Sequence, residues 1–305
     1  MFKKDEKMWF GTKDYMTWIT PPLAGADSSP AAWGSEGTLL NGGGYAFNSF
    51  NSHKTYNYAW SGGSTRQEAQ LMKSFADGTY GRGRIFFQEP NIYDTNVLAA
   101  RLADPSLTAD YEGPELVPNV ATTTVATSAF EVNGLPVRTM NYPVGAALPV
   151  LNADNVLAQD NFVPVPDGKS LLVQAFYAPA PGSTGLGIYV VEANTGGEPA
   201  ATGVRLTPNT NSGAVAFQVF DKGPGVIGYY IFIGRSTGVI TGNMQVAAIH
   251  ARIADTGETM IGEDTWMGGQ GHSGVRFTGK PTYVTRSGIN GGQIEYAATF
   301  KEVQD

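Results

Sequence analysis

Histidines are the first places to look for chemistry in this sequence, which holds three of them, because histidine serves as a general base and a metal ligand. His250 alternates out of phase with its apolar neighbours, which predicts that it points off the core face of a strand. His272 stands beside Ser273 in the run GGQGHSG, and a His–Ser pair can form part of a nucleophilic site. The run lacks the Gly-x-Ser-x-Gly spacing and no helix follows it, so a polar turn is the stronger prediction.

A second group of residues could bind or cleave sugars. Glu263 and Asp264 lie near Trp266, and carboxylates beside an aromatic ring resemble a sugar-binding loop. Glycoside hydrolysis needs two carboxylates held about 5–10 Å apart in a cleft. Adjacent residues on a strand face opposite ways, so these two acids do not by themselves make such a pair. Together with His272 they form the candidate glycan-binding site.

The remaining sequence offers no catalytic, metal or cofactor site. The absence of cysteine excludes disulfides, thiol nucleophiles and Cys-ligated zinc. The glycine-rich run 41–44 lacks the lysine of a phosphate-binding loop, and no calcium-loop spacing occurs, so solvated loops explain the acidic residues. We therefore expect a protein that is not an enzyme and that needs no cofactor.

Charge and hydropathy exclude two classes of partner. The net charge is −7 and the pI is about 5.0, whereas nucleic acids and anionic membranes require a basic surface. No apolar run approaches the roughly 20 residues that span a bilayer. Residues 1–7 are charged and lack the apolar centre of a secretory signal, so we expect synthesis in the cytoplasm without a signal peptide.

The clearest structural unit lies between Lys54 and Pro90. Residues 55–60 alternate, with aromatic side chains on one face, which is typical of a half-buried strand. Thr65 and Glu68 have capping-box spacing, and apolar residues follow at helical intervals, so a helix is predicted at about 65–77. We expect this helix to pack on the strands that flank it. By contrast, residues 25–37 read as a long polar loop, a candidate arm for contacting a neighbour.

The rest of the chain predicts β-structure in a second domain. Low charge content (15%) and 39 glycines suit a rigid all-β protein. Short strands separated by turn residues predict a sandwich or jelly roll. The strands are expected at residues 122–132, 137–142, 169–177, 187–193, 214–220, 228–234, 245–253 and 293–303.

A shift in charge places the domain boundary. Residues 1–104 hold ten basic and ten acidic residues, whereas residues 105–203 hold two basic and nine acidic residues, a net charge of −7. Three prolines fall between residues 105 and 118. The sequence therefore predicts an N-terminal β-domain with one helix at 1–104, a linker at 105–118 and a C-terminal β-sandwich at 119–305.

Several segments, taken together, resemble minor tail proteins of long-tailed bacteriophages (siphoviruses) of actinobacteria. They are MWFGTKDYMTWI (8–19), YNYAW (56–60), FADGTYG (75–81), RIFF (84–87), WMGGQGHSG (266–274) and GGQ (291–293). The resemblance implies a structural virion protein of the tail tip or baseplate, such as the distal tail protein. Such proteins join the tail tube to the tip hub as rings, commonly hexamers. They combine an N-terminal β-domain bearing one helix with a galectin-like or carbohydrate-module-like sandwich.

The ring hypothesis assigns a role to the N-terminal aromatic residues. Tryptophan and tyrosine supply large contact areas at low entropic cost, so they suit contacts between copies. Filling the domain's own core is an equally good explanation. The alternative function is a tail adhesin that binds a host cell-wall glycan through the sandwich. The candidate assembly residues are Trp9, Tyr15, Trp18, Trp33, Tyr56, Tyr58 and Trp60.

Overall fold

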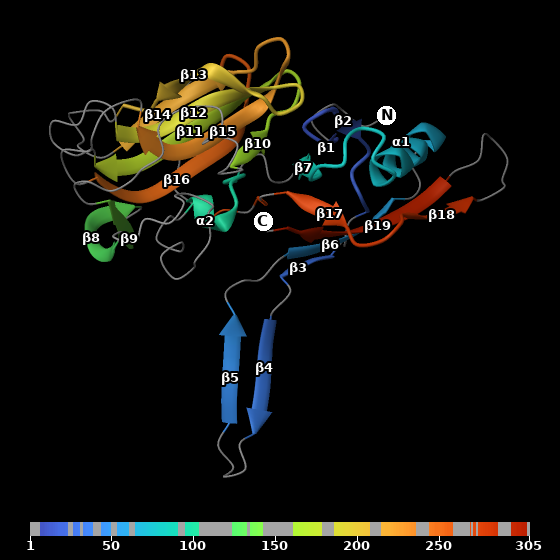
Figure 1. Cartoon of the computed structure of the whole chain (residues 1–305), viewed down its shortest axis with the longest axis horizontal. Helices are drawn as coiled ribbons and strands as arrows, with labels where there is room; N and C mark the ends of the chain where they lie inside the picture. Colours follow the sequence, from blue (N-terminus) through green and yellow to red (C-terminus); the bar gives the residue numbers. More distant parts are fainter. Residues whose placement is uncertain are drawn as a thin grey trace.

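The chain forms two β-rich lobes and a projecting pair of strands (Figure 1). This computed structural model describes residues 7–23, 27–30, 33–38, 44–49, 54–60, 65–90, 95–103, 124–132, 135–142, 161–178, 186–207, 215–235, 244–258, 269, 271–272, 274–285 and 294–303. The domain boundary predicted at 105–118 falls outside these residues.

One lobe, here called the terminal lobe, is built from both ends of the sequence. The strand β19 pairs antiparallel with β6, and Phe300 lies opposite Tyr56. The prediction that residues 119–305 all belong to the sandwich is therefore wrong for the last strands, because alternation shows that a strand exists but not which sheet it joins. The strands of this lobe are β1 (Met8–Gly11), β2 (Met16–Ile19), β3 (Asp27–Pro30), β6 (Lys54–Trp60), β7 (Phe86–Gln88), β17 (Val275–Phe277), β18 (Thr282–Thr285) and β19 (Ile294–Glu302).

The strands of the terminal lobe form two sheets around an aromatic core. One sheet has the order β2-β1-β7, and the other has the order β17-β19-β6-β3, with β18 also pairing with β19. Phe10, Phe87 and Phe300 meet between the sheets, with ring centroids 5.8–6.4 Å apart. The second sheet therefore joins strands from both ends of the chain, and the first sheet closes the same core.

The predicted helix is confirmed as α1 (Arg66–Ala76). Thr65 caps it: the Thr65 side chain accepts a hydrogen bond from the Glu68 backbone N–H, and the Glu68 side chain accepts one from the Thr65 backbone N–H. Gly78 follows the last turn with φ of 74°, a conformation that glycine adopts without strain. Met72 and Phe75 are buried against the β6–β19 sheet, as the apolar stripe predicted.

The second lobe is the predicted β-sandwich, so the fold class is confirmed as mainly β with one packed helix. Its two sheets have the orders β10-β15-β12-β13 and β14-β11-β16-β9-β8. Residues from β11, β12, β15 and β16 fill the space between them, and a short helix, α2 (Ala100–Ala103), packs against β16. The strands are β8 (Thr124–Val132), β9 (Leu135–Tyr142), β10 (Phe162–Pro164), β11 (Lys169–Ala178), β12 (Leu186–Asn194), β13 (Pro199–Arg205), β14 (Val215–Asp221), β15 (Val226–Arg235) and β16 (Met244–Asp255).

The projecting part, here called the arm, consists of β4 (Trp33–Thr38) and β5 (Gly44–Ser49). The two strands pair antiparallel, with Trp33 opposite Ser49, and form a sheet of their own. The prediction of a loop over residues 25–37 is therefore wrong for residues 27–30, which form β3, and for residues 33–37. Sequences such as WGSEGT have no apolar alternation, so the period-2 signal did not reveal them.

None of the described helices is long and apolar enough to cross a membrane.

We expect Phe300→Ala to lower the free energy of unfolding by about 3–5 kcal/mol, because Phe300 is fully buried and its loss leaves a cavity. The matched control is Phe217→Ala on the edge strand β14, where the ring is 48% exposed and the loss should stay below about 1 kcal/mol. Urea unfolding measures both. Equal losses would mean that the C-terminal strand does not complete the core of the terminal lobe.

Candidate functional site

The β6 aromatic residues, predicted to contact neighbouring copies, are buried inside the terminal lobe. Tyr56, Tyr58 and Trp60 are 5%, 2% and 1% exposed. Trp60 stacks on Tyr296 at 4.6 Å, and its Nε1 donates a hydrogen bond to the Thr20 carbonyl at 2.9 Å. A side chain with so little exposed area offers almost no contact surface to another subunit. The assembly prediction is wrong for these three residues, and the core explanation holds.

Trp9 and Trp18 contribute to an interface, but it lies within the chain. Their rings meet edge to face at 5.0 Å. Trp9 is 2% exposed and carries the Lys222 ammonium 4.8 Å above its ring, while Trp18 packs against the core of the sandwich. The prediction that Trp9 contacts neighbouring copies is wrong, because its ring is buried beneath Lys222 of the sandwich. Trp18 is only partly buried, so its assembly role stays a prediction.

The structure does not test the assembly role of the other two candidate residues, Tyr15 and Trp33. Tyr15 is 42% exposed and stacks on Tyr80 with ring centroids 4.6 Å apart, so part of its ring faces the surface. Trp33 lies in the arm strand β4. The assembly role of both remains a prediction.

The ring of His272 packs against aromatic residues of the terminal lobe, while the residue as a whole is partly exposed. Its ring lies 4.2 Å from Phe87 and 5.7 Å from Tyr56, its Nε2 is buried, and its Nδ1 accepts a hydrogen bond from the Gly274 N–H at 3.0 Å. Burial, with the nearby Lys54 ammonium as a second cause, lowers the pKa of His272 to about 3. These contacts give His272 a packing role, and its part in glycan binding stays a prediction.

The other three glycan candidates, Glu263, Asp264 and Trp266, lie outside the described residues. Within the described part of the chain, no group of three or more His, Asp and Glu side chains could hold a metal ion.

A lysine–aromatic contact that sequence reasoning missed joins the two lobes. The Lys13 ammonium, from the β1–β2 turn, lies 5.6 Å from the centroid of Phe86, 5.3 Å from Phe162 and 5.0 Å from Tyr230. Phe86 belongs to the terminal lobe, and the other two rings belong to the sandwich. The Lys13 carbonyl also accepts a hydrogen bond from the Gly196 N–H at 2.9 Å. A cation held between such rings is attracted to their electron-rich faces.

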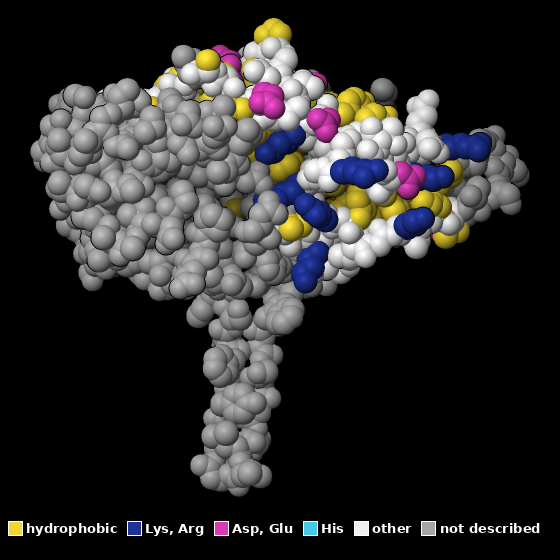
Figure 2. Space-filling view, viewed as in Figure 1, with side chains coloured by type: hydrophobic (Ala, Val, Ile, Leu, Met, Phe, Trp, Pro, Cys, Tyr) yellow, Lys and Arg dark blue, Asp and Glu magenta, His cyan; other side chains and the backbone are white. Residues whose placement is uncertain are grey.

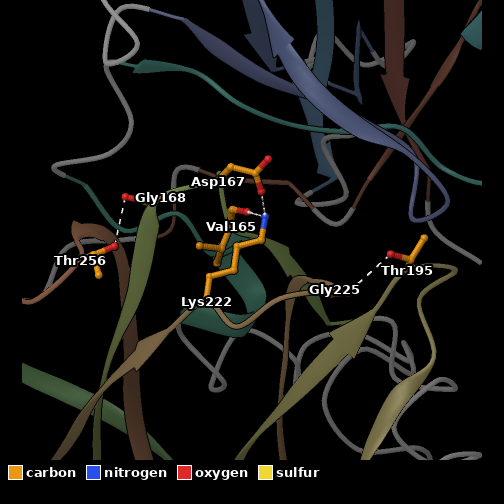
Figure 3. Close-up of polar contacts among 7 residues, drawn as sticks. All are labelled: Val165, Asp167, Gly168, Thr195, Lys222, Gly225 and Thr256. Carbon is orange, nitrogen blue, oxygen red and sulfur yellow. Dashed lines mark hydrogen bonds and ion pairs between the residues drawn. The ribbon is translucent and has the colours of Figure 1, made fainter.

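A second lysine makes the reciprocal contact from the sandwich side. Lys222 Nζ donates a hydrogen bond to the Val165 carbonyl at 2.8 Å and pairs with Asp167 at 2.6 Å (Figure 3). Its side chain is only 7% exposed, and it lies over Trp9 of the terminal lobe. Each lobe thus places one lysine against an aromatic surface of the other.

The signal that could have revealed this contact is the apolar run of β15. Residues 226–233 are all buried, because Tyr229 and Ile231 face the sandwich core while Tyr230 and Phe232 face the terminal lobe. Strands buried on both faces have continuous apolar runs instead of alternation. The run VIGYYIFI therefore indicates that another layer covers the sandwich.

The arm pairs with no other described strand, and the outer face of the β19–β6 sheet carries exposed residues. On β6, Asn57 and Ala59 are exposed on the side opposite α1. A groove of about 310 Å³ opens there, and Figure 2 shows Lys and Arg side chains distributed over the terminal lobe. The groove is lined by Asn57, Tyr58, Ala59, Thr278, Gly279, Lys280, Thr282, Ala297, Ala298 and Thr299.

Comparison with known proteins gives only distant similarity in structure. Neither protein-family models nor curated proteins match the sequence. The CBM22-1 xylan-binding domain from Paenibacillus barcinonensis is similar over 50% of this chain and 92% of its own, with 8% identity and a TM-score of 0.28. The enzymatically active domain of tailspike protein 4 from bacteriophage CBA120 matches 51% of this chain and 22% of its own, with 11% identity and a TM-score of 0.27. The VP2 subviral particle of infectious bursal disease virus matches 99% of this chain and 77% of its own, with 11% identity and a TM-score of 0.26.

We expect the burial of His272 to make the terminal lobe sensitive to acid. Its pKa is about 3 when folded and about 6.5 when unfolded, so the unfolded chain binds the extra proton between these values. The stabilising contribution is therefore complete above pH 6.5 and is lost as the pH falls towards 3. His272→Gln should flatten the dependence of the unfolding free energy on pH in this window, measured by urea denaturation at several pH values. If the unfolding free energy of the variant depends on pH as steeply as that of the original protein, the lowered pKa of folded His272 would be contradicted.

Removing the cation that joins the lobes should weaken the fold. We expect Lys13→Gln to lower the free energy of unfolding by about 0.5–2 kcal/mol, because the neutral amide loses its attraction to three rings. Lys73→Gln, at an exposed position on α1, is the matched control and should change it by less than about 0.5 kcal/mol. Chemical denaturation measures the free energy of unfolding of both variants. Equal losses would contradict a stabilising contact between Lys13 and the three rings.

Proposed function

We propose that this chain is a structural, non-enzymatic subunit of a bacteriophage tail tip, a distal tail protein whose copies form a ring. In that position it would join the tail tube to the tip hub. The observation that carries the proposal is the arm: two paired strands that extend away from both lobes (Figure 1) and that pair with no other described strand. An isolated two-stranded hairpin is only marginally stable in water. A surface contributed by another chain would supply what the arm lacks.

The distribution of aromatic residues supports the same proposal. The large aromatic side chains of β1, β2 and β6 are used inside the chain, where they build a core and fix the sandwich to the terminal lobe. The protein therefore combines a two-lobed body with a separate projecting element. That division of roles suits a subunit that works through shape and contact with its neighbours.

The alternative is a glycan-binding adhesin, for which three of the four candidate residues lie outside the described residues and the fourth, His272, packs against Phe87 and Tyr56. No observation on the described residues favours sugar binding, so we propose the assembly function alone.

We expect replacement of residues 31–50 by a short Gly–Ser linker to leave the protein monomeric, whereas the intact chain forms a ring. Size-exclusion chromatography with light scattering measures the mass of each, and electron microscopy shows the ring. The thermal midpoint of the monomer should change little, because the arm pairs with no other described strand.

The control for this deletion is the intact chain with the same linker added after Asp305, which should still assemble. A ring that persists without the arm would contradict the role of the arm. An intact chain that stays monomeric and is absent from purified virions would contradict the proposed function itself.

A further inference from the structure

The outer face of the β19–β6 sheet is unlike its inner face. The inner face carries large side chains and is covered by α1. The outer face carries Asn57 and Ala59 from β6 with Ala297 and Thr299 from β19, and Thr299 Oγ1 donates a hydrogen bond to Asn57 Oδ1 at 3.0 Å. No described element lies over these four residues, and Asn57 and Ala59 are exposed.

The groove on this face runs over β6 and β19 beside the β17–β18 turn. Small residues form its floor, and the β17–β18 turn with Lys280 forms one wall. Layers of β-structure normally pack about 10 Å apart, and small side chains allow a closer approach. The groove therefore accepts an added layer of backbone without displacing any large side chain.

The arm leaves the terminal lobe next to the edge strand β3 (Figure 1). It points away from the β17-β19-β6-β3 sheet and pairs with no other described strand. The same chain thus holds a strand pair outside its sheets and a sheet face that no described element covers.

We propose that the arm of one copy lies in the groove of the next copy, so that each copy donates one arm and accepts one. The inference rests on the proposed function, because it names the contact by which the copies assemble. Such a contact joins two different surfaces head to tail and closes into a ring when the rotation between copies permits. It also gives both uncovered surfaces a partner at once.

The charges of the two surfaces are complementary. Glu36 is the one Asp, Glu, Lys or Arg residue between residues 33 and 49, so the arm carries a single negative charge. Lys280 is exposed on the wall of the groove. An arm seated in the groove brings these opposite charges to the same region, so Glu36 and Lys280 form an ion pair between copies.

Crosslinking tests the location of the contact, and the chain suits it because it contains no cysteine. A variant with Ser35→Cys and Thr282→Cys, treated with a flexible bis-maleimide, should give a ladder of covalent oligomers on a denaturing gel. Each single variant can link at most two copies. The control pair is Ser35→Cys with Thr207→Cys, since Thr207 is exposed on the sandwich just after β13, and it should give no ladder.

Charge reversal tests the pairing. Lys280→Glu and Glu36→Lys should each weaken assembly by about fivefold in apparent dissociation constant, the range expected for an exposed ion pair. The double variant should recover the original value, and Lys73→Glu on the α1 side should leave it unchanged. Light scattering over a dilution series gives the apparent dissociation constant of the two single variants, the double variant and the Lys73→Glu control.

The results separate this inference from the proposed function. Rings that form while the groove pair gives no ladder, or charge variants that assemble normally, would overturn the arm-in-groove contact and leave the tail-ring function standing. A chain that is monomeric at every concentration would overturn both.

Discussion

The antiparallel pairing of β6 with β19 is the constraint on which the rest of the structure depends. It joins a strand near the N-terminus to the last strand of the chain, with Tyr56 opposite Phe300. The helix α1 needs this sheet for its apolar stripe, and the β2-β1-β7 sheet closes the same core from the other side. The sandwich is therefore an insertion between two parts of one lobe, held at both of its ends.

The junction between the lobes makes this insertion a fixed part of the body. The β10-β15-β12-β13 sheet buries one face in the sandwich and the other against the terminal lobe. Lys13 and Lys222 cross the junction in opposite directions, each against aromatic rings of the other lobe. Burial supplies most of the stabilisation, because a cation near a ring adds only about 0.5–2 kcal/mol. The two lysines instead favour one orientation of the sandwich relative to the terminal lobe.

The aromatic residues of the terminal lobe serve its own fold. Their large rings fill the core, whereas the outer face of the β19–β6 sheet carries small and polar residues such as Asn57, Ala59 and Thr299. In the proposed ring, specificity between copies would come from paired β-surfaces and opposite charges rather than from large aromatic side chains.

Local patterns in the sequence determined the helix α1 with its Thr65 cap, most of the sandwich strands and the mainly β class. These features depend on neighbours in the chain, through capping hydrogen bonds and the alternation of side chains. Only the tertiary structure decided that β19 joins β6, that Trp9 is buried and His272 packs against Phe87, and that β4 and β5 form an arm. Those outcomes depend on contacts between residues far apart in sequence. Alternation and composition do not indicate which distant surface a strand or an aromatic ring will contact.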